Sequence, residues 1–412
     1  MTRVLLLVPS TTYRATAFIE AARRLGFELV VGSDRRQVFE DAVPGHMPTL
    51  DFNDQDAAVA EIERFAGERP LQGLVGADDE TTLLAAAAAR ALGLRGNPPQ
   101  AVAATRNKLL LRQRLERHRI PGPWYRCFDV AGDPASAARA VRFPCVLKPT
   151  FLAASRGVIR ADGPGEFAAA YARIRKILQD PKLEHWAGAQ ARQLLVEEYL
   201  PGSEYAVEAI LSSGSFRLLA LFDKPDPLEG PYFEETLYVT PSRAPEDLQE
   251  QIVAAAERAV HALGLAEGPV HAELRATPRG VFLIEVAARA IGGRCSRVLR
   301  FEDGASLEEL ILRQAVGEDV SGFRRESRAA GVMMIPIPRA GLLREVAGVE
   351  EARAVEGVEA VEITLARTQP VEPLPEGFQY LGFLLARATT PDEVEAALRR
   401  AHGLLRVEID PA

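Results

Sequence analysis

The 412-residue sequence is poor in cysteine, in basic charge and in long apolar runs, and each shortage excludes a class of protein. Its three cysteines, Cys127, Cys145 and Cys295, are an odd number without metal-ligand spacing, so we expect buried, reduced thiols. A net charge of -8 argues against a nucleic-acid partner. No apolar run approaches the roughly 20 residues that span a bilayer. The N-terminus also lacks the pattern of a signal peptide. We therefore expect a cytoplasmic protein that binds neither nucleic acid nor membrane.

A dinucleotide-binding fingerprint is also missing. The first strand-like run, residues 3–9, leads into PSTTYR instead of the Gly-x-Gly-x-x-Gly that a Rossmann fold places there. Strand-like and helical patterns nevertheless alternate up to residue 95, which is typical of a parallel α/β sheet. The first domain is thus predicted to be an α/β domain that binds no NAD.

The length predicts two to four domains, because a single core rarely grows so large. The Pro- and Gly-rich stretch 95–100 predicts a break in regular structure, and a helix is predicted to follow it over 101–120. From about residue 328 the pattern changes to short strands with one helix, which indicates a small α+β region. We therefore divide the chain into four parts: 1–95, 96–195, 196–325 and 326–412.

One predicted hairpin carries two acidic side chains. If its loop spans residues 277–281, Glu273 lies opposite Glu285, with Cβ atoms roughly 5 Å apart on one face. Leu283 and Arg289 are predicted to share that face with Glu285. Two such carboxylates repel each other unless a cation lies between them, and carboxylate oxygens are ligands that Mg²⁺ prefers. A charged, solvent-facing surface of an antiparallel sheet is the competing interpretation.

Several motifs occur in a distinctive order around this hairpin. VLKP at 146–149 ends an apolar strand with a lysine, and LVEEYLPGSEY follows at 195–205. Together with the hairpin, this order resembles the ATP-grasp superfamily of carboxylate–amine ligases over residues 1–320. The segments EVAARAIGG at 285–293 and 377–398 resemble the bacterial L-amino-acid ligases, which form dipeptides. The resemblance implies an α/β ATP-grasp fold with an N-terminal parallel α/β domain and a C-terminal α+β region.

The resemblance also implies residue roles. Lys108 and Lys148 bind the ATP phosphates, and the loop 153–158, with Ser155 and Gly157, closes over them although it is poor in glycine. Glu197 accepts from the adenine amino group, Tyr199 and Leu200 form the hinge contact through their backbone, and Glu204 accepts from the ribose. Glu273 and Glu285 hold Mg²⁺ or Mn²⁺. Arg289 lies near the transferred phosphoryl group. Substrate contacts are assigned to Tyr232, Glu235, His271, Gly292, Gly293 and Arg294.

Some residues have simpler interpretations or depart from the family pattern. Many members carry a further metal ligand, Asn, where this chain has Ala287, which leaves the number of metal ions open. Lys108 fits a solvated basic helix face, and Asp78, Asp79 and Glu80 fit the capped start of a helix.

The function that the resemblance implies is ATP-dependent ligation of a carboxylate to an amine through an acylphosphate. Two amino acids are the expected substrates, and a homodimer is the expected assembly. The alternatives are a ligase for another carboxylate and a nucleotide-binding protein without catalysis.

Overall fold

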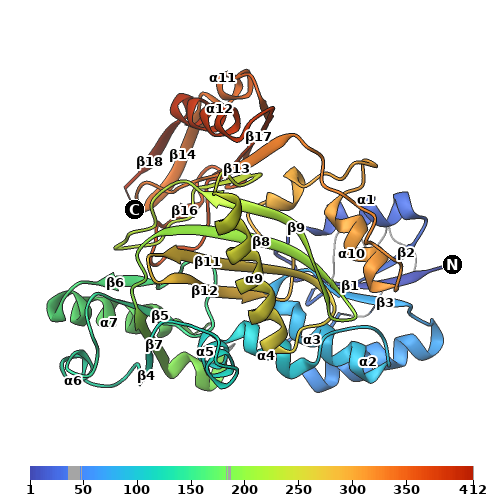
Figure 1. Cartoon of the computed structure of the whole chain (residues 1–412), viewed down its shortest axis with the longest axis horizontal. Coiled ribbons are helices and arrows are strands. Elements are labelled where there is room, and N and C mark those ends of the chain that lie inside the picture. Colours follow the sequence, from blue (N-terminus) through green and yellow to red (C-terminus); the bar gives the residue numbers. More distant parts are fainter. Residues whose placement is uncertain (36–46, 48, 182, 184–186, 412) are drawn as a thin grey trace.

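A computed structural model describes residues 1–35, 47, 49–181, 183 and 187–411. Its N-terminal part is a three-stranded parallel sheet in the order β2-β1-β3 with helices packed on it, as the sequence predicted (Figure 1). The elements are β1 (Arg3–Leu7), α1 (Ala15–Leu25), β2 (Glu28–Gly32), α2 (Gln55–Glu68), β3 (Gly73–Gly76) and α3 (Asp79–Ala91).

The helix predicted over 101–120 is two helices, α4 (Pro99–Arg106) and α5 (Lys108–Arg117). Asn107 separates them with an extended backbone, and its side-chain oxygen accepts from the backbone N–H groups of Leu109 and Leu110, each at 3.0 Å. A side chain that satisfies free N–H groups starts a new helix. Lys108 is consequently the first residue of α5, at a fixed position.

The next part is a four-stranded antiparallel sheet in the order β4-β7-β5-β6, with α6 and α7 packed on it. Its core includes Phe167, Tyr171 and Ile174 of α7. The elements are β4 (Tyr125–Asp129), α6 (Pro134–Ala138), β5 (Cys145–Pro149), β6 (Ile159–Ala161), α7 (Pro164–Leu178), the short 3-10 helix η2 (Gly188–Arg192) and β7 (Gln193–Glu198).

An eight-stranded sheet, β12-β11-β8-β9-β10-β13-β17-β15, forms the centre of the molecule (Figure 1). Its strands are β8 (Ser203–Ser212), β9 (Ser215–Lys224), β10 (Leu237–Thr240), β11 (Gly268–Thr277), β12 (Gly280–Ala287), β13 (Ala329–Ile335), β15 (Val358–Ile363) and β17 (Gly382–Ala388). Three of these strands come from the predicted C-terminal region. The boundary at 325/326 therefore divides two segments that share one sheet.

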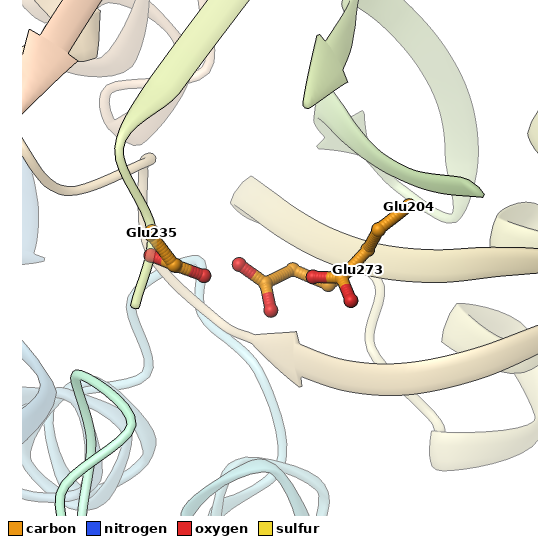
Figure 2. A group of neighbouring side chains, drawn as sticks. All are labelled: Glu204, Glu235 and Glu273. Carbon is orange, nitrogen blue, oxygen red and sulfur yellow. The ribbon is translucent and has the colours of Figure 1, made fainter. Parts of the chain in front are cut away.

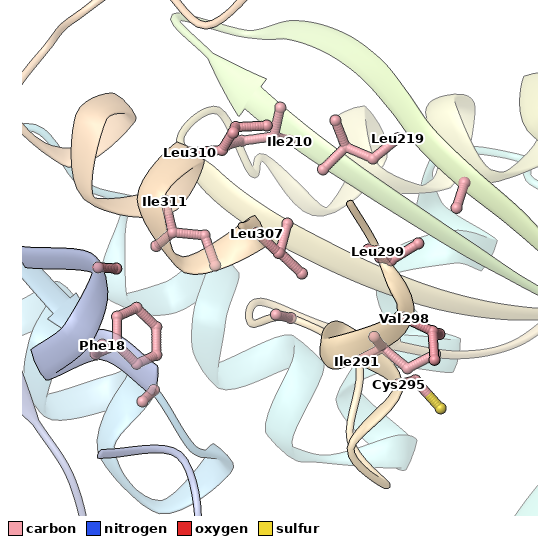
Figure 3. Close-up of a cluster of buried hydrophobic side chains, with 14 of the residues drawn as sticks. Phe18, Ile210, Leu219, Ile291, Cys295, Val298, Leu299, Leu307, Leu310 and Ile311 are labelled. Atoms are coloured by element: carbon pink, nitrogen blue, oxygen red, sulfur yellow. The ribbon is translucent and has the colours of Figure 1, made fainter. Parts of the chain in front are cut away.

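Helices and a second small sheet complete the fold. Helix α9 packs with α4 and α5 on one side of the large sheet. On the other side α1 meets α10, and one buried cluster there contains Phe18 of α1, Leu307 and Ile311 of α10, and Val298 of the short helix η3 (Figure 3). The remaining elements are α9 (Glu246–Leu263), η3 (Cys295–Val298), α10 (Leu307–Ala315), β14 (Gly341–Ala347), α11 (Val349–Arg353), β16 (Pro370–Val371), α12 (Pro391–Leu404) and β18 (Arg406–Asp410).

The acidic hairpin has the predicted pairing but a different turn. Thr277 pairs with Gly280, so the loop contains two residues and not five. A bulge at Ile284 then restores the register that brings Glu273 opposite Glu285. The bulge also changes the alternation of side chains. Leu283 packs into the core beside α9, so the prediction that it shares a face with Glu285 is wrong.

Two further sequence predictions concern burial and membranes. Cys145 and Cys295 are buried and free as expected, whereas Cys127 is free but exposed on β4, contrary to the prediction. Among the described residues, no helix has the length and apolar character needed to cross a membrane.

Candidate active site

A cleft with about 720 Å³ of open space lies between the four-stranded sheet and the large sheet. Most of the predicted nucleotide and metal residues line it together: Lys108, Lys148, Ser155, Glu197, Tyr199, Leu200, Glu204, Glu273 and Glu285. Apolar side chains, among them Val146, Leu228, Phe233 and Ile284, form the remainder of the lining. The cleft thus combines an apolar lining with a dense set of charges.

Lys148 is the penultimate residue of β5 and pairs with a buried carboxylate. Its ammonium lies 2.5 Å from Glu197 Oε2, and both side chains are less than 10% exposed. Burial lowers the pKa of Lys148 despite this partner. Burial alone would raise the pKa of Glu197, but the charges of Arg112 and Lys148 lower it to about 2. Glu197, predicted to accept from adenine, is therefore the counter-ion that positions Lys148.

Arg112 is a site residue that the sequence did not reveal. Its Nε and Nη2 donate to Glu197 at 2.7 and 3.2 Å, and its other hydrogen bonds reach the carbonyls of Leu283 and Ile284 at 3.0 and 2.9 Å. The side chain is buried, although the α5 sequence fitted a solvated basic face. Arg112 joins the four-stranded sheet to β12 across the back of the cleft.

The segment after β7 contributes the predicted hinge residues. The backbone N–H of Tyr199 donates to the Pro144 carbonyl at 3.3 Å, and the Leu200 carbonyl accepts from Arg275 at 2.8 Å. Arg275 also donates to Glu204 Oε2 at 2.8 Å. The hinge and the predicted ribose acceptor are thereby fixed by one buried arginine.

Three glutamates point toward one another in the cleft, and Figure 2 shows Glu204, Glu235 and Glu273 in this arrangement. Lys224 contacts all three, at 2.7, 2.7 and 3.0 Å. Burial would lower the pKa of this lysine, but the three carboxylates raise it well above its ordinary value. Burial and the charge of Glu273 raise the pKa of Glu235 to about 7.

Lys224 was also missed in the sequence, although a signal was present. It is the last residue of the apolar strand β9 and precedes Pro225, and Lys148 likewise lies near the end of β5 and precedes Pro149. The same Lys-Pro ending occurs at both walls of the cleft. A lysine at the end of a buried strand is uncommon unless a partner compensates its charge.

Glu285 has a different protein cation. Its carboxylate lies 3.3 Å from Lys108 Nζ, which also donates to the Leu152 carbonyl at 2.7 Å. Protein ammonium groups therefore neutralise both opposed carboxylates of the hairpin, Glu273 through Lys224 and Glu285 through Lys108. The two glutamates still present carboxylate oxygens to the same cleft, which is the donor chemistry that Mg²⁺ takes. Ala287 is buried and paired with His271, and supplies no ligand.

His271 lies beside the cluster, between two acids. Its ring nitrogens are 3.4 Å from Glu208 and 3.4 Å from Glu273. Burial alone would lower the pKa of His271, but hydrogen bonds to Glu208 and Glu273 raise it to about 9. Glu208 is fully buried, and it also accepts from the backbone N–H of Ile291 at 3.1 Å. This arrangement ties the cluster to the turn after β12.

Arg289 does not line the cleft described above and instead contacts the N-terminal domain. Its Nη2 lies 2.6 Å from Asp79, which also pairs with Arg106 at 3.2 Å. The charges of Arg289 and Arg106 lower the pKa of Asp79 although its burial would raise it. Asp78 caps α3 as predicted, within a capping box. The acidic start of α3 is therefore both a cap and a partner for Arg289.

The other substrate candidates are dispersed. The Tyr232 hydroxyl contacts Arg173 of α7, outside the cleft lining. Gly292 lies beside Tyr13 and Arg14, and Gly293 packs against Met334. Arg294 pairs with Glu362 at 3.1 Å and lies over the Tyr13 ring. Of the predicted substrate residues, Glu235 lines the cleft and His271 adjoins it.

Comparison with known proteins identifies similar families along the chain. Residues 19–96 match an ATP-grasp N-terminal domain, 141–298 an ATP-grasp domain, and 333–410 an L-amino acid ligase C-terminal domain 2. The fold is similar to the crystal structure of an L-amino acid ligase from Bacillus licheniformis, with a TM-score of 0.86 and 26% identity. That match covers 100% of this chain and 99% of the other.

Curated relatives match part of the chain. An alanine–anticapsin ligase of Bacillus subtilis is 28% identical, and carnosine synthase 1 of Gallus gallus is 33% identical, each over 66% of this chain. The matched region spans 58% of the first relative and 31% of the second.

Proposed function

Since the chain belongs to the ATP-grasp superfamily, we propose that it is an ATP-dependent ligase that joins the carboxylate of one L-amino acid to the amine of another. Three lysines carry the proposal. Lys108, Lys148 and Lys224 come from a helix and two separate strands, and all three converge on the carboxylates of one cleft. The amino-acid substrates are proposed from the relatives, among them an alanine–anticapsin ligase.

The cleft residues fit the binding of ATP. The apolar walls, Val146, Leu228 and Ile284, suit a purine, and the lysines suit a triphosphate. Glu273 and Glu285 would hold Mg²⁺, which when bound neutralises phosphate charge and orients the terminal phosphoryl group. In this account the phosphate oxygens of bound ATP replace the carboxylates as the partners of the lysine ammonium groups.

The proposed chemistry begins with attack of the acid substrate's carboxylate on the γ-phosphorus of ATP. The bond to the bridging oxygen breaks, and ADP leaves. The amine then attacks the acylphosphate carbon, loses a proton, and expels phosphate to leave the amide. Such phosphoryl transfer depends on in-line positioning and on fixed positive charge, which Lys108 and Lys148 supply. The loop 153–158 would exclude water, which otherwise hydrolyses the acylphosphate.

The test is a phosphate-release screen over all pairs of amino acids with ATP and Mg²⁺, with products identified by mass. We expect phosphate release that requires both amino acids, with one dipeptide formed per phosphate. Release with a non-amino-acid carboxylate would change the proposed substrate class. Binding of ATP without turnover on any acid–amine pair would contradict ligation.

A further inference from the structure

The closing loop 153–158 is in contact with a segment far away in the chain, residues 372–378 of the C-terminal region. The backbone N–H of Gly157 donates to the Pro375 carbonyl at 2.8 Å. Arg156 Nε donates to the Glu376 carbonyl at 2.9 Å, and its guanidinium lies 5.2 Å from the centroid of the Phe378 ring. The Gly157 contact joins the backbone of the loop directly to the backbone of the distant segment.

The loop needs such external support because its own conformation is strained. Ala154 and Ser155 have φ angles of 52° and 55°, in the left-handed region that costs an L-residue roughly 1–2 kcal/mol. Gly157 also has a positive φ, and a Cβ there would lie 2.9 Å from the Pro149 ring. Strained backbone persists when the surrounding structure fixes it. Ala153 and Ser155 of this loop line the cleft, so the strain lies at its wall.

Glu376 extends the contact to the rest of the four-stranded part. Its carboxylate accepts from two nitrogens of Arg173 on α7, one of them at 2.7 Å. The third Arg173 nitrogen contacts the Tyr232 hydroxyl. Tyr232 in turn forms a β-bridge with Ile159, directly after the loop. Glu376 is therefore linked through Arg173 to α7 and, through Tyr232, to the segment that contains the cleft residue Glu235.

From this geometry we propose that residues 372–378 form a latch that fixes the 153–158 loop over the phosphate end of the cleft, with Glu376 as its positioning residue. The latch rests on the proposed function in that it serves ATP binding. The C-terminal region thereby helps to close the 153–158 loop over the nucleotide, in addition to adding strands to the large sheet. Opening of the four-stranded part must break the Glu376 contacts together with those of Arg156 and Gly157.

Cleavage by trypsin measures how often the loop is released, because the peptide bond after Arg156 lies inside the 153–158 loop. We compare cleavage at this bond, followed by mass spectrometry without nucleotide, in the full-length wild type, Glu376→Ala, and the control Glu372→Ala, none of which adds a trypsin site. Glu372 is an exposed residue of the same segment. We expect about two- to fivefold faster cleavage in Glu376→Ala than in the other two proteins, the range of a partly exposed ion pair. Equal rates in the three proteins would overturn the latch.

A charge exchange distinguishes positioning from a general loss of structure. Arg173→Glu combined with Glu376→Arg restores opposite charges, so we expect the KM for ATP to recover toward the wild-type value. In Glu376→Arg alone, the KM for ATP should rise about threefold, with the KM values of both amino acids unchanged. A uniform change in all three KM values, or no recovery in the exchange variant, would contradict the proposal. Absence of turnover in the wild type would refute the proposed function alone, because the cleavage comparison needs no substrate.

Discussion

At the scale of single residues, the cleft is governed by how each buried charge is compensated. Lys148 has one carboxylate, shared with Arg112, whereas Lys224 has three. A buried ion that loses its partner is strongly destabilising, because no water replaces the lost contact. Substitutions in the cleft will therefore affect stability and catalysis to different degrees, according to the partners that remain.

Lys224→Met tests the acidic cluster. Removal of the ammonium leaves Glu204, Glu235 and Glu273 within 4.8 Å of one another without a shared cation. We expect the free energy of unfolding at pH 7 to fall by about 3–5 kcal/mol, with part of the loss recovered by added Mg²⁺. Thermal denaturation with and without MgCl₂ measures this, and Lys176→Met on the exposed side of α7 is the control. A Lys224→Met protein as stable as that control would show that the cluster needs no cation.

Glu285→Gln tests the predicted metal ligand. Glu285 is about one-third exposed and pairs with Lys108, so its neutralisation should leave the fold intact. We expect ADP formation to fall by about 100-fold, comparable to the larger losses seen when groups that support a metal ion are changed. Steady-state ADP release measures the effect, and circular dichroism checks the fold. Normal turnover in this variant would remove Glu285 from the mechanism.

At the scale of elements, the hairpin shows what sequence reasoning could and could not predict. The pairing of Glu273 with Glu285 was predicted from an assumed five-residue loop, whereas the structure reaches the same pairing through a two-residue turn and a bulge. The bulge at Ile284 was not predictable, since a shorter turn with one extra residue gives the same pairing as the longer loop. Contacts between distant residues, such as Arg112 with Glu197, also had no signal, because local pattern carries no information on which helix face a strand will meet.

The junction of α4 and α5 provides a prediction at this scale. The Asn107 cap fixes the first turn of α5 and with it Lys108. Asn107→Ala should lower the free energy of unfolding by about 1 kcal/mol and raise the KM for ATP, because the helix start frays. Asn107→Asp retains the capping oxygen but loses the hydrogen bond that Asn107 Nδ2 donates to Gln190 at 2.7 Å, so we expect a smaller loss than in Asn107→Ala. Chemical denaturation and initial-rate kinetics measure both effects. Equal losses in the two variants would argue against the cap.

At the scale of the whole molecule, buried ion pairs hold the parts together around the cleft. Glu197 links the four-stranded sheet to α5, and Arg112 extends that link to β12. Asp79 joins the N-terminal domain to Arg289 in the same way. The order of the parts was predictable from the motifs, whereas the sharing of one sheet by residues 203–388 was not, because β-pairing partners are not encoded in local periodicity.

This organisation predicts a defined acid sensitivity. The pKa of Glu197 is lowered to about 2 from an ordinary 4.5. As the pH falls, Glu197 therefore becomes protonated in the unfolded chain before it does in the folded protein. The stabilising contribution, about 3 kcal/mol, is complete above pH 4.5 and is lost between pH 4.5 and about 2. Glu197→Gln should therefore be less stable at pH 7 and lose less stability on acidification. Denaturant titrations at pH 7 and pH 3 measure the difference. Parallel losses in both proteins would contradict this assignment.

The central claim is that the acidic hairpin and the three lysines form a nucleotide–metal site. The most direct measurement is a crystal structure with a non-hydrolysable ATP analogue and Mn²⁺, with the ion located by its anomalous signal. The account predicts an anomalous peak in contact with carboxylate oxygens of Glu273 and Glu285, and triphosphate oxygens on Lys108 and Lys148. A peak elsewhere, with Glu273 still bound to Lys224 and Glu285 still bound to Lys108, would contradict it.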